Sequence, residues 1–290
     1  AALLLALAAL RMPHFPPLLD LTGDEVWSVW QSSVGGPREI VARTPFDWPP
    51  GYYLLLGGWQ ALVGSHPVVV RYGMLLAHLI GAAAVYRAGR RFYGDTAAGV
   101  LAVLFYSVGG WAIFLSLHLR GHSLTFALAP VLLGTALFYF SRPRWLRGVL
   151  FGAGLAAMLY IHVTVVIFYV ALGVFTLILY GWRALRDWIV PVLTLGVLAI
   201  PEITHKVALA LQSRQSLAVE PPPLSEALWR YFAEIGRQAE VLWLVLLVVG
   251  IGLALWRERS QRRRGMALAF WLVFPLVLLI PALRDIFTPR

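Results

Sequence analysis

The chain has 290 residues, of which 60% are hydrophobic and only 13% are charged, and it carries a formal net charge of +10. Soluble domains average about 45–50% apolar and about 25% charged residues, so this composition excludes an ordinary soluble globular protein and indicates an integral membrane protein. The absence of cysteine also excludes a disulfide framework and a thiolate metal site.

Apolar runs divide the chain into predicted transmembrane helices, each of which needs about 20 apolar residues to cross the hydrocarbon core. Nine apolar runs are the candidate crossings: residues 1–10, 67–86, 96–117, 123–140, 149–160, 163–180, 189–200, 241–256 and 266–283. We interpret the first as the outer half of a span whose start is missing, and we expect truncation at the other end too. The pattern predicts a single all-α domain over residues 1–290, a polytopic transmembrane helical bundle of about nine spans.

The stretch from 149 to 180 is the least regular part of this pattern. Its length is short for two spans of about 20 residues each and long for one. We expect two short helices that meet near His162.

Arginine is concentrated in one set of the loops that connect the runs. If the runs alternate in direction, the loops at 87–95, 141–148, 181–188 and 257–265 lie on one side of the membrane. They contain thirteen of the 24 basic residues and three acids, and thirteen minus three is the whole net charge of +10. The positive-inside rule places these loops in the cytoplasm and the others outside. The basic charge therefore indicates topology, and we expect no nucleic-acid partner.

Two long segments, residues 11–66 and 202–240, fall on the outer side. The first is rich in tryptophan and tyrosine and carries five acids, which is typical of helices that lie in the membrane interface. The second contains three consecutive prolines at 221–223. It is either a solvated loop with an interfacial helix or a cap that admits an acceptor to a cavity. We expect any chemistry on this outer side, because the cytoplasmic loops are short and basic.

The first outer segment contains LTGDEVWSVW, residues 21–30, in which Asp24 and Glu25 are adjacent. Thr22 and Glu25 have the spacing of a capping box, so both acids have a structural explanation at the start of a helix. The same helix would turn its tryptophans toward lipid and leave Asp24, Ser28 and Gln31 on another face. That face would point into a polar cavity, which is the functional alternative.

Arg120 and His122 in LHLRGHSL lie at the outer junction of two runs, and His162 in LYIHVTVV lies between two others. Ionisable residues at membrane depth usually pair with one another or mark a functional site. An arginine can hold a phosphate with two hydrogen bonds, although a snorkelling interfacial arginine explains Arg120 equally well. His118 and His162 accompany no metal-ligand spacing, which favours hydrogen-bonded structural histidines.

The run PPGYY at 49–53 follows Asp47 and precedes the next span. Consecutive prolines break a helix and redirect the chain at this point. Tyr52 and Tyr53 then either anchor the chain in the interface or line a lipid or sugar site, and the sequence does not decide between these alternatives.

The order of these features resembles the membrane-embedded glycosyltransferases of the GT-C type, which include protein O-mannosyltransferases and the lipid A aminoarabinose transferase. The resemblance covers roughly residues 20–180. It is carried by the Asp24–Glu25 pair, PPGYY, VVVRYGMLL with Arg71, YRAGRRFYGDTAAG at 86–99, FLSLHLRGHSL with Arg120, and LYIHVTVV with His162.

This resemblance implies a donor in which a sugar is joined through phosphate to a polyprenyl chain, and an acceptor that is a lipid, a glycan or a protein. Attack at the anomeric carbon would expel polyprenyl phosphate, whose charge Arg120 would hold with Arg71 as a helper. Asp24 would accept the proton of the acceptor hydroxyl, with Glu25 as an orienting or second contact. A single in-line displacement would invert the sugar carbon. The predicted substrate-binding set is completed by Tyr52, Tyr53, His122 and His162.

The resemblance is incomplete in one loop. His118 and His122 occupy positions where the family often has an acid and an aromatic residue, which puts an acidic metal or sugar contact there in doubt. The acids form no recognisable metal-ligand motif. We therefore predict no cofactor and metal-independent chemistry, with a divalent cation as the alternative.

Two other functional classes fit a multi-span membrane protein. A lipid-linked sugar transporter or flippase would need polar residues near the bilayer midplane, and the runs at 67–86 and 96–117 have few away from their ends. A noncatalytic membrane subunit would tolerate the loss of Asp24. We predict a cell-envelope glycosyltransferase, a multi-pass protein of the bacterial plasma membrane whose active site faces outward.

Overall fold

The computed structural model describes residues 2–14, 20–33, 35–44, 48–108, 110–212 and 266. These residues form helices and connecting turns, and this part of the chain contains no β-strand, which confirms the expected all-α fold. Contacts divide the chain into two compact units. The first comprises residues 1–168 and 186–211, and the second comprises residues 169–185 and 212–290.

The first unit contains most of the described helices. It begins with α1 (Ala2–Arg11), a 3-10 turn η1 (Met12–His14), and three short helices, α2 (Gly23–Ser32), α3 (Pro37–Arg43) and α4 (Gly51–Val63). Five helices follow: α5 (Pro67–Tyr93), α6 (Thr96–Val108), α7 (Gly110–Leu117), α8 (Gly121–Ser141) and α9 (Trp145–Ile161). The remaining helices are α10 (Val165–Tyr180) and α11 (Arg183–Asp187), each divided between the units, and α12 (Ile189–Gln212).

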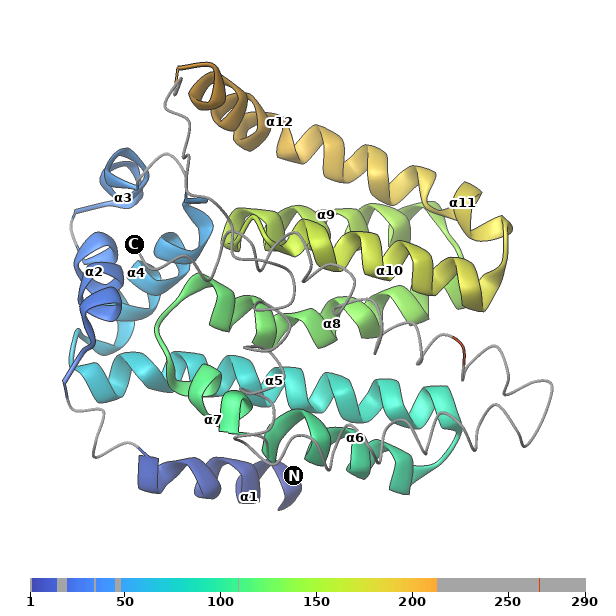
Figure 1. Cartoon of the computed structure of the whole chain (residues 1–290), viewed down its shortest axis with the longest axis horizontal. Helices are drawn as coiled ribbons and strands as arrows, with labels where there is room; N and C mark the ends of the chain where they lie inside the picture. Colours follow the sequence, from blue (N-terminus) through green and yellow to red (C-terminus); the bar gives the residue numbers. More distant parts are fainter. Residues whose placement is uncertain are drawn as a thin grey trace, which may run out of the picture. The chain divides into compact units, whose positions relative to one another are not determined.

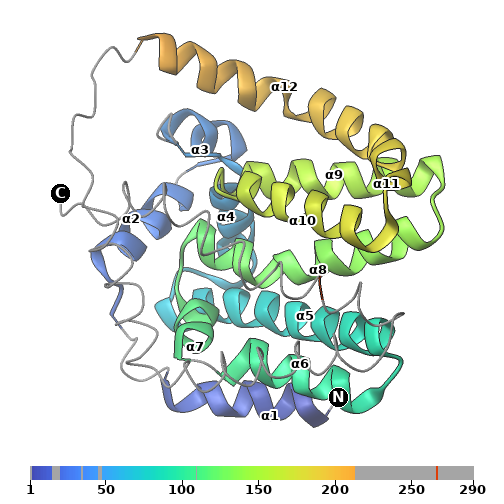
Figure 2. The same cartoon turned by 45° about the vertical axis from the view of Figure 1, so that its right-hand side comes forward.

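Helix α5 organises the first unit (Figures 1 and 2). It packs against α6 and α8, and α1 lies along it as well. Helix α9 packs on α8. The three short helices α2, α3 and α4 pack on one another at the end of the unit where α5 begins. The segment of residues 11–66, predicted to lie on the outer side, therefore meets the N-terminal ends of α5 and α8.

Three segments of the described residues are long and apolar enough to cross a membrane, namely Pro67–Tyr93, Gly121–Ser141 and Arg183–His205. Four other expected spans correspond to shorter apolar helices, α1, α6, α9 and α10. The runs at 241–256 and 266–283 lie outside the described residues, apart from Met266. The membrane-spanning character is thus supported, and the number of nine spans stays a prediction.

The break predicted between 149 and 180 is confirmed. Helix α9 ends at Ile161 and α10 begins at Val165. Between them His162 caps α9 in an extended conformation, with φ −160° and ψ 129°. Two short helices therefore meet at His162, as expected.

Two helix boundaries differ from the expected ones. The run at 96–117 forms two helices, α6 and α7, where the sequence has glycine at 109 and 110 and glycine weakens a helix interior. The helix expected to end at Ile200 continues through Pro201 to Gln212. The stretch after Pro201 is rich in alanine and leucine, which are good helix formers. The start of the predicted outer loop at 202–240 is therefore helical, and residues 213–240 lie outside the described residues.

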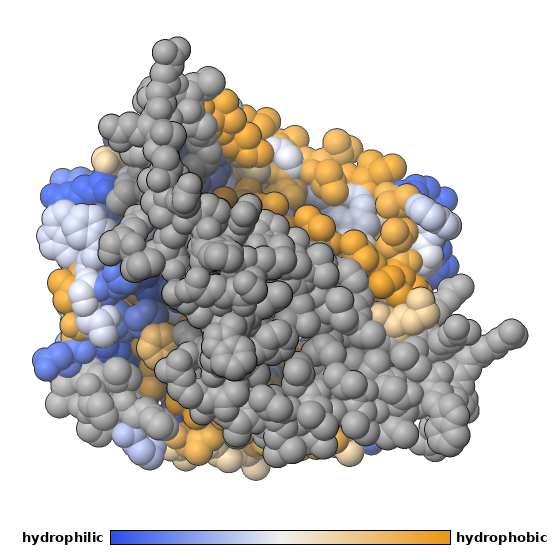
Figure 3. All heavy atoms as spheres, in the orientation of Figure 1, coloured by the Kyte–Doolittle hydropathy of each residue, from blue (hydrophilic) through white to orange (hydrophobic). Residues whose placement is uncertain are grey.

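Apolar side chains remain at the surface of the long helices. On α12, Val192, Leu193 and Val197 are 51%, 63% and 65% exposed. Figure 3 shows hydrophobic residues along this helix and hydrophilic residues over α2 and α3. Exposed apolar side chains gathered in this way are suited to contact with lipid.

Arg11, the last residue of α1, is fully buried among α5, α6 and α7. Its guanidinium donates to the Ser116 hydroxyl at 2.8 Å and to the carbonyls of Leu7 and Ser107 at 2.8 and 2.9 Å. It also lies 2.8 Å from Nε2 of His78. Because arginine has no acceptor, Nε2 of His78 must accept this bond and the ring must be neutral. These bonds, which the sequence patterns did not indicate, fix α1 to the helices around it.

Replacement of Arg11 by leucine should lower the thermal stability of the protein. Several buried acceptors would lose their donor, and an unsatisfied buried group costs about 1–3 kcal/mol. Lysine should restore only part of the loss, because an ammonium lacks the planar fork of donors. The measurement is the midpoint of thermal unfolding in detergent, followed by circular dichroism. Arg38→Leu, at an exposed position of α3, is the matched control, and equal midpoints for the two variants would contradict this role of Arg11.

Candidate functional site

Glu25, in the first turn of α2, lies at the centre of the candidate site. The backbone N–H of Thr22 donates to Oε2 of Glu25 at 3.0 Å, and the Thr22 hydroxyl donates to the same oxygen at 3.1 Å. The capping box expected from the sequence is therefore present. The Glu25 side chain is only 1% exposed, so its charge needs further partners.

Arg71 supplies the opposite charge from the second turn of α5. Its Nη2 lies 2.6 Å from Oε2 of Glu25 and also donates to the backbone carbonyl of Asp20 at 3.2 Å. The Arg71 side chain is fully buried. Removal of one partner from a buried ion pair is strongly destabilising. This pair therefore ties α2, and the residues before it, to the start of α5.

The other oxygen of Glu25 is bound by residues 118–120, which connect α7 and α8. The backbone N–H of Leu119 donates to Oε1 at 3.1 Å, and Nδ1 of His118 lies 3.4 Å from it. Burial by itself would raise the pKa of Glu25. The bonds from His118, Thr22 and Leu119, together with the Arg71 charge, outweigh burial and lower this pKa to about 2. Glu25 is therefore a carboxylate at neutral pH and is held by donors from three parts of the chain.

Asp24 has a different environment from its neighbour, because adjacent residues of a helix point in different directions. Its side chain is 72% exposed, and its Oδ2 lies 3.7 Å from Nη2 of Arg120, which is only 12% exposed. Nη1 of Arg120 donates to the Asp24 carbonyl at 3.3 Å. The guanidinium lies over the ring of Trp48, 4.7 Å from its centroid, in a cation–π contact. The structure therefore brings the predicted Asp24 and Arg120 together.

Three histidine rings adjoin this pair. The ring centroids of His118 and His122 are 5.8 Å apart, those of His122 and His162 are 6.1 Å apart, and His162 lies 6.1 Å from Trp48. Burial and the charge of Arg120 lower the pKa of His162, so this ring is neutral at pH 7. We call this group of side chains the Asp24–Arg120 cluster; it consists of Asp24, Trp48, His118, Arg120, His122 and His162.

Tyr52 and Tyr53 lie in the first turn of α4 and are 2% and 1% exposed. Burial raises the pKa of Tyr52 well above its ordinary value, so its hydroxyl is neutral. Helices α4, α8 and α9 approach closely here: a Cβ at Gly121 would lie 2.9 Å from the carbonyl oxygen of Ile161 and 3.6 Å from Cβ of Tyr52. The two tyrosines are therefore packed inside the protein and are not exposed interfacial anchors. Their contact with a substrate stays a prediction.

The predicted division of α2 into an exposed tryptophan face and a polar face agrees with the structure except at Asp24. Trp27 and Trp30 are each 47% exposed, whereas Ser28 and Gln31 are buried, as expected. Asp24 does not share their buried face, and Glu25 does. The polar face of this helix thus packs against protein, and the exposed acid lies at its edge.

Sequence reasoning missed two contributors to the site. The ring of Trp48 lies against the guanidinium of Arg120. In the sequence, only the position of Trp48 directly before the double proline could have indicated a role. Leu119 binds Glu25 through its backbone N–H, which no side-chain pattern could indicate. His118, interpreted as a structural histidine, lies against Glu25. Arg71 was predicted to help hold a phosphate, and the structure places its guanidinium against Glu25.

Metal ligation was not expected at this site, with a divalent cation kept as the alternative. Among the described residues, no three His, Asp or Glu side chains are arranged to hold a metal ion. Of the two acids, Glu25 is occupied by protein donors and Asp24 faces Arg120. Metal-independent chemistry stays a prediction.

Comparison with known proteins identifies one family. The sequence model of the family described as dolichyl-phosphate-mannose-protein mannosyltransferase matches residues 47–205, which is more than half of the 290 residues. The matched region contains Arg71, Arg120 and His162, whereas Asp24 and Glu25 precede it. No curated protein and no solved structure matches the chain.

The lowered pKa of Glu25 should make part of the stability depend on pH. A carboxyl group whose pKa is lower in the folded chain stabilises the fold fully above its unfolded pKa, and this contribution is lost as the pH falls through the folded pKa. For Glu25 the window runs from 4.5 down to about 2. Over this window the thermal midpoint of the wild type should fall more than that of Glu25→Gln. The variant should be the less stable of the two at neutral pH, because Arg71 loses its buried partner.

The control for this experiment is Glu39→Gln, which removes an exposed carboxylate from α3. Its thermal midpoint should follow that of the wild type throughout the titration. Parallel curves for the wild type and Glu25→Gln would show that Glu25 does not have a lowered pKa.

Proposed function

The chain belongs to the dolichyl-phosphate-mannose-protein mannosyltransferase family, and on that premise we propose that this membrane glycosyltransferase moves a sugar from a polyprenyl-phosphate donor to an acceptor hydroxyl on the extracytoplasmic side. One observation carries the proposal: the Asp24 carboxylate and the Arg120 guanidinium converge at 3.7 Å. The first group can accept a proton, and the second can hold negative charge. Such a transfer requires both, because the acceptor hydroxyl loses a proton and the departing phosphate carries negative charge.

Asp24 is the proposed general base. Its carboxylate is mostly exposed, and its distance from Arg120 is longer than a good hydrogen bond. An acceptor hydroxyl could therefore reach it without displacing a buried partner. Glu25 is unsuited to this task because its two oxygens are already bound by protein donors. A general base must come within hydrogen-bond reach of the proton that it accepts, and Asp24 meets that condition more easily.

Arg120 is the proposed phosphate ligand. Its guanidinium is oriented by the Trp48 ring and the Asp24 carbonyl. Its Nε is buried and has no hydrogen-bond partner among the described residues. A guanidinium keeps its charge and can bind a phosphate through two parallel hydrogen bonds. Such a group stabilises the charge that develops on a phosphate leaving group.

Glu25 and Arg71 are proposed as positioning residues. Glu25 binds the N–H of Leu119, which directly precedes Arg120, and Arg71 fixes Glu25 in turn. The pair would hold Arg120 in place without touching the donor. His122 and His162 adjoin Arg120 and are proposed to contact the sugar or its phosphate. The buried Tyr52 and Tyr53 are proposed to complete the substrate-binding set.

The proposed reaction is a single displacement. The acceptor oxygen forms a bond to the anomeric carbon while the bond from that carbon to the phosphate oxygen breaks. The hydroxyl proton passes to Asp24, and polyprenyl phosphate leaves with its charge held by Arg120. Attack opposite to the leaving group would invert the sugar carbon. The arginine-rich loops, on the other side of the bundle by the positive-inside rule, support an outward-facing site.

The other two classes considered from the sequence receive less support. The family is one of glycosyltransferases, which favours transfer over transport. The buried polar groups around Arg11 are bonded to one another, so they suit a structural contact better than a transport pathway. If the protein were a noncatalytic subunit, Asp24→Asn would leave the activity of its complex unchanged, whereas in an enzyme it would lower the rate.

Asp24→Asn and Arg120→Ala should each abolish most of the transfer activity. Loss of a general base lowers the rate by about 10²–10⁴-fold, and loss of a group that holds developing negative charge lowers it by about 10²–10³-fold. The measurement is sugar transfer by the purified protein from radiolabelled polyprenyl-phosphate sugars.

Asp20→Asn is the control for Asp24→Asn. Asp20 carries an exposed carboxylate four positions earlier, and its replacement should leave transfer near the wild-type rate. Equal transfer by the wild type, Asp24→Asn and Arg120→Ala would remove the proposed roles of both residues.

Chelation should leave the transfer rate unchanged, because the proposed mechanism holds the phosphate with protein side chains, Arg120 above all, and uses no metal ion. The test compares the purified protein before and after treatment with a strong chelator of divalent cations. Activity that disappears and then returns with a divalent ion would place a metal in the mechanism.

A further inference from the structure

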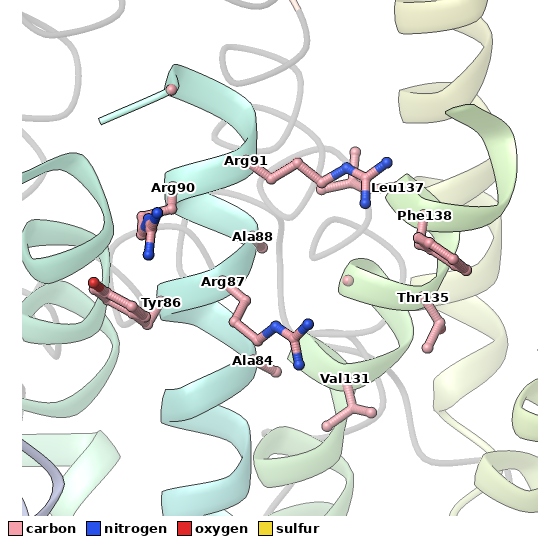
Figure 4. A pocket seen from close by; sticks show the side chains of 12 residues that line it. Ala84, Tyr86, Arg87, Ala88, Arg90, Arg91, Val131, Thr135, Leu137 and Phe138 are labelled. Carbon is pink, nitrogen blue, oxygen red and sulfur yellow. The ribbon is translucent and has the colours of Figure 1, made fainter. Parts of the chain in front are cut away.

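A pocket lies at the opposite end of α5, away from the Asp24–Arg120 cluster. It has a volume of about 780 Å³ and lies between the C-terminal halves of α5 and α8. Figure 4 shows Arg87 and Arg91 reaching from α5 toward α8, whereas Arg90 points to the other side, beside Tyr86. The proposed mechanism uses none of these residues.

The pocket forms because α5 and α8 separate toward this end. The helices approach closely at Gly81, where a Cβ would lie 2.1 Å from the carbonyl oxygen of Ala127. Beyond that point small residues line both walls, including Ala84 and Ala88 of α5 and Gly134 of α8. A Cβ at Gly134 would meet nothing within 4 Å. The space beside α8 is therefore open to a ligand.

The charged residues that line the pocket are all arginines, and no acid is among the lining residues. Arg91 is held in place by the Ser141 hydroxyl at 2.5 Å and by the Phe138 ring, 5.4 Å from its guanidinium. Arg87 has no hydrogen-bond, ion-pair or ring partner among the described residues. The pocket thus presents one fixed guanidinium and one available guanidinium to an anion.

The position of these arginines along α5 corresponds to the boundary between the hydrocarbon core and the headgroups of a membrane. Helix α5 has 27 residues, which span about 40 Å at 1.5 Å per residue, against a hydrocarbon core of about 30 Å. If the start of α5 lies at one edge of the core, Arg87 lies near the other edge. Val131, Leu137 and Phe138 add an apolar wall beside the arginines. A ligand with an anionic head and a hydrocarbon tail would match both parts.

We propose that this pocket binds the phosphate of an anionic phospholipid, with Arg87 and Arg91 as its ligands and the apolar wall of α8 against an acyl chain. Basic pockets between helices at a membrane surface are suited to anionic lipid headgroups. Arginine binds phosphate through charge-assisted, bidentate hydrogen bonds. The lipid would come from the leaflet opposite to the Asp24–Arg120 cluster. This site goes beyond the proposed transfer reaction and does not depend on it.

The experiment is native mass spectrometry of the full chain, purified in detergent and mixed with phosphatidylglycerol or with phosphatidylcholine of the same acyl chains. The wild type should retain phosphatidylglycerol in preference to phosphatidylcholine. Arg87→Gln combined with Arg91→Gln should weaken phosphatidylglycerol binding by about thirtyfold, given the contribution of each arginine beside an anionic leaflet. The matched control, Arg142→Gln combined with Arg144→Gln, removes the same charge from exposed positions outside the pocket and should bind like the wild type.

A second pair of variants tests the pocket without changing charge. Gly134→Trp should fill the open space and weaken phosphatidylglycerol binding. Gly196→Trp places the same side chain on α12, where a Cβ also meets nothing within 4 Å, and should not weaken it. This pair keeps the proposal testable if the double arginine variant does not fold.

Several outcomes would overturn the proposal. Equal losses in the pocket variant and its charge-matched control would show nonspecific attraction of the lipid to a basic protein. Binding that survives both Gly134→Trp and the loss of Arg87 and Arg91 would place the lipid elsewhere. Complete displacement of the lipid by inorganic phosphate would show a free-phosphate site instead, since phosphate cannot replace contacts with the apolar wall.

Discussion

The buried ion pair between Glu25 and Arg71 is the contact on which the candidate site depends. A buried carboxylate is costly unless donors replace its water, and this one receives them from α2, from α5 and from the segment before α8. These three elements are far apart in the sequence, so the pair fixes their positions relative to one another. Because Leu119 binds the same carboxylate, the pair also fixes the backbone next to Arg120.

Two adjacent acids have opposite environments in this arrangement. Glu25 faces the protein interior and keeps its charge through buried bonds, whereas Asp24 is mostly exposed. The difference follows from helix geometry, since successive residues of an α-helix point about a quarter turn apart. One acid can therefore hold the helix in place while its neighbour stays accessible beside Arg120. The capping box and the proposed chemistry are thus compatible explanations of one sequence motif.

Helix α5 carries arginines with different surroundings at its two ends. Arg71 is neutralised by a buried carboxylate near the start of the helix. Arg87 and Arg91, about 24–30 Å further along at 1.5 Å per residue, line a pocket whose lining residues include no acid. The first arrangement stabilises the fold, and the second attracts an anion. The same residue type therefore serves structure at one end of the helix and binding at the other.

The sequence by itself determined the membrane class, most of the apolar helices, the capping box of Thr22 and the helix break at His162, because these follow from composition, apolar run length and local hydrogen bonding. It also selected Asp24 and Arg120, which the structure brings together. Only the tertiary structure decided that Arg71 binds Glu25 and that the Leu119 N–H shares this carboxylate. The reason is physical: these bonds join groups about 46 to 94 positions apart, and a backbone N–H is the same in every residue except proline, so no local pattern records them.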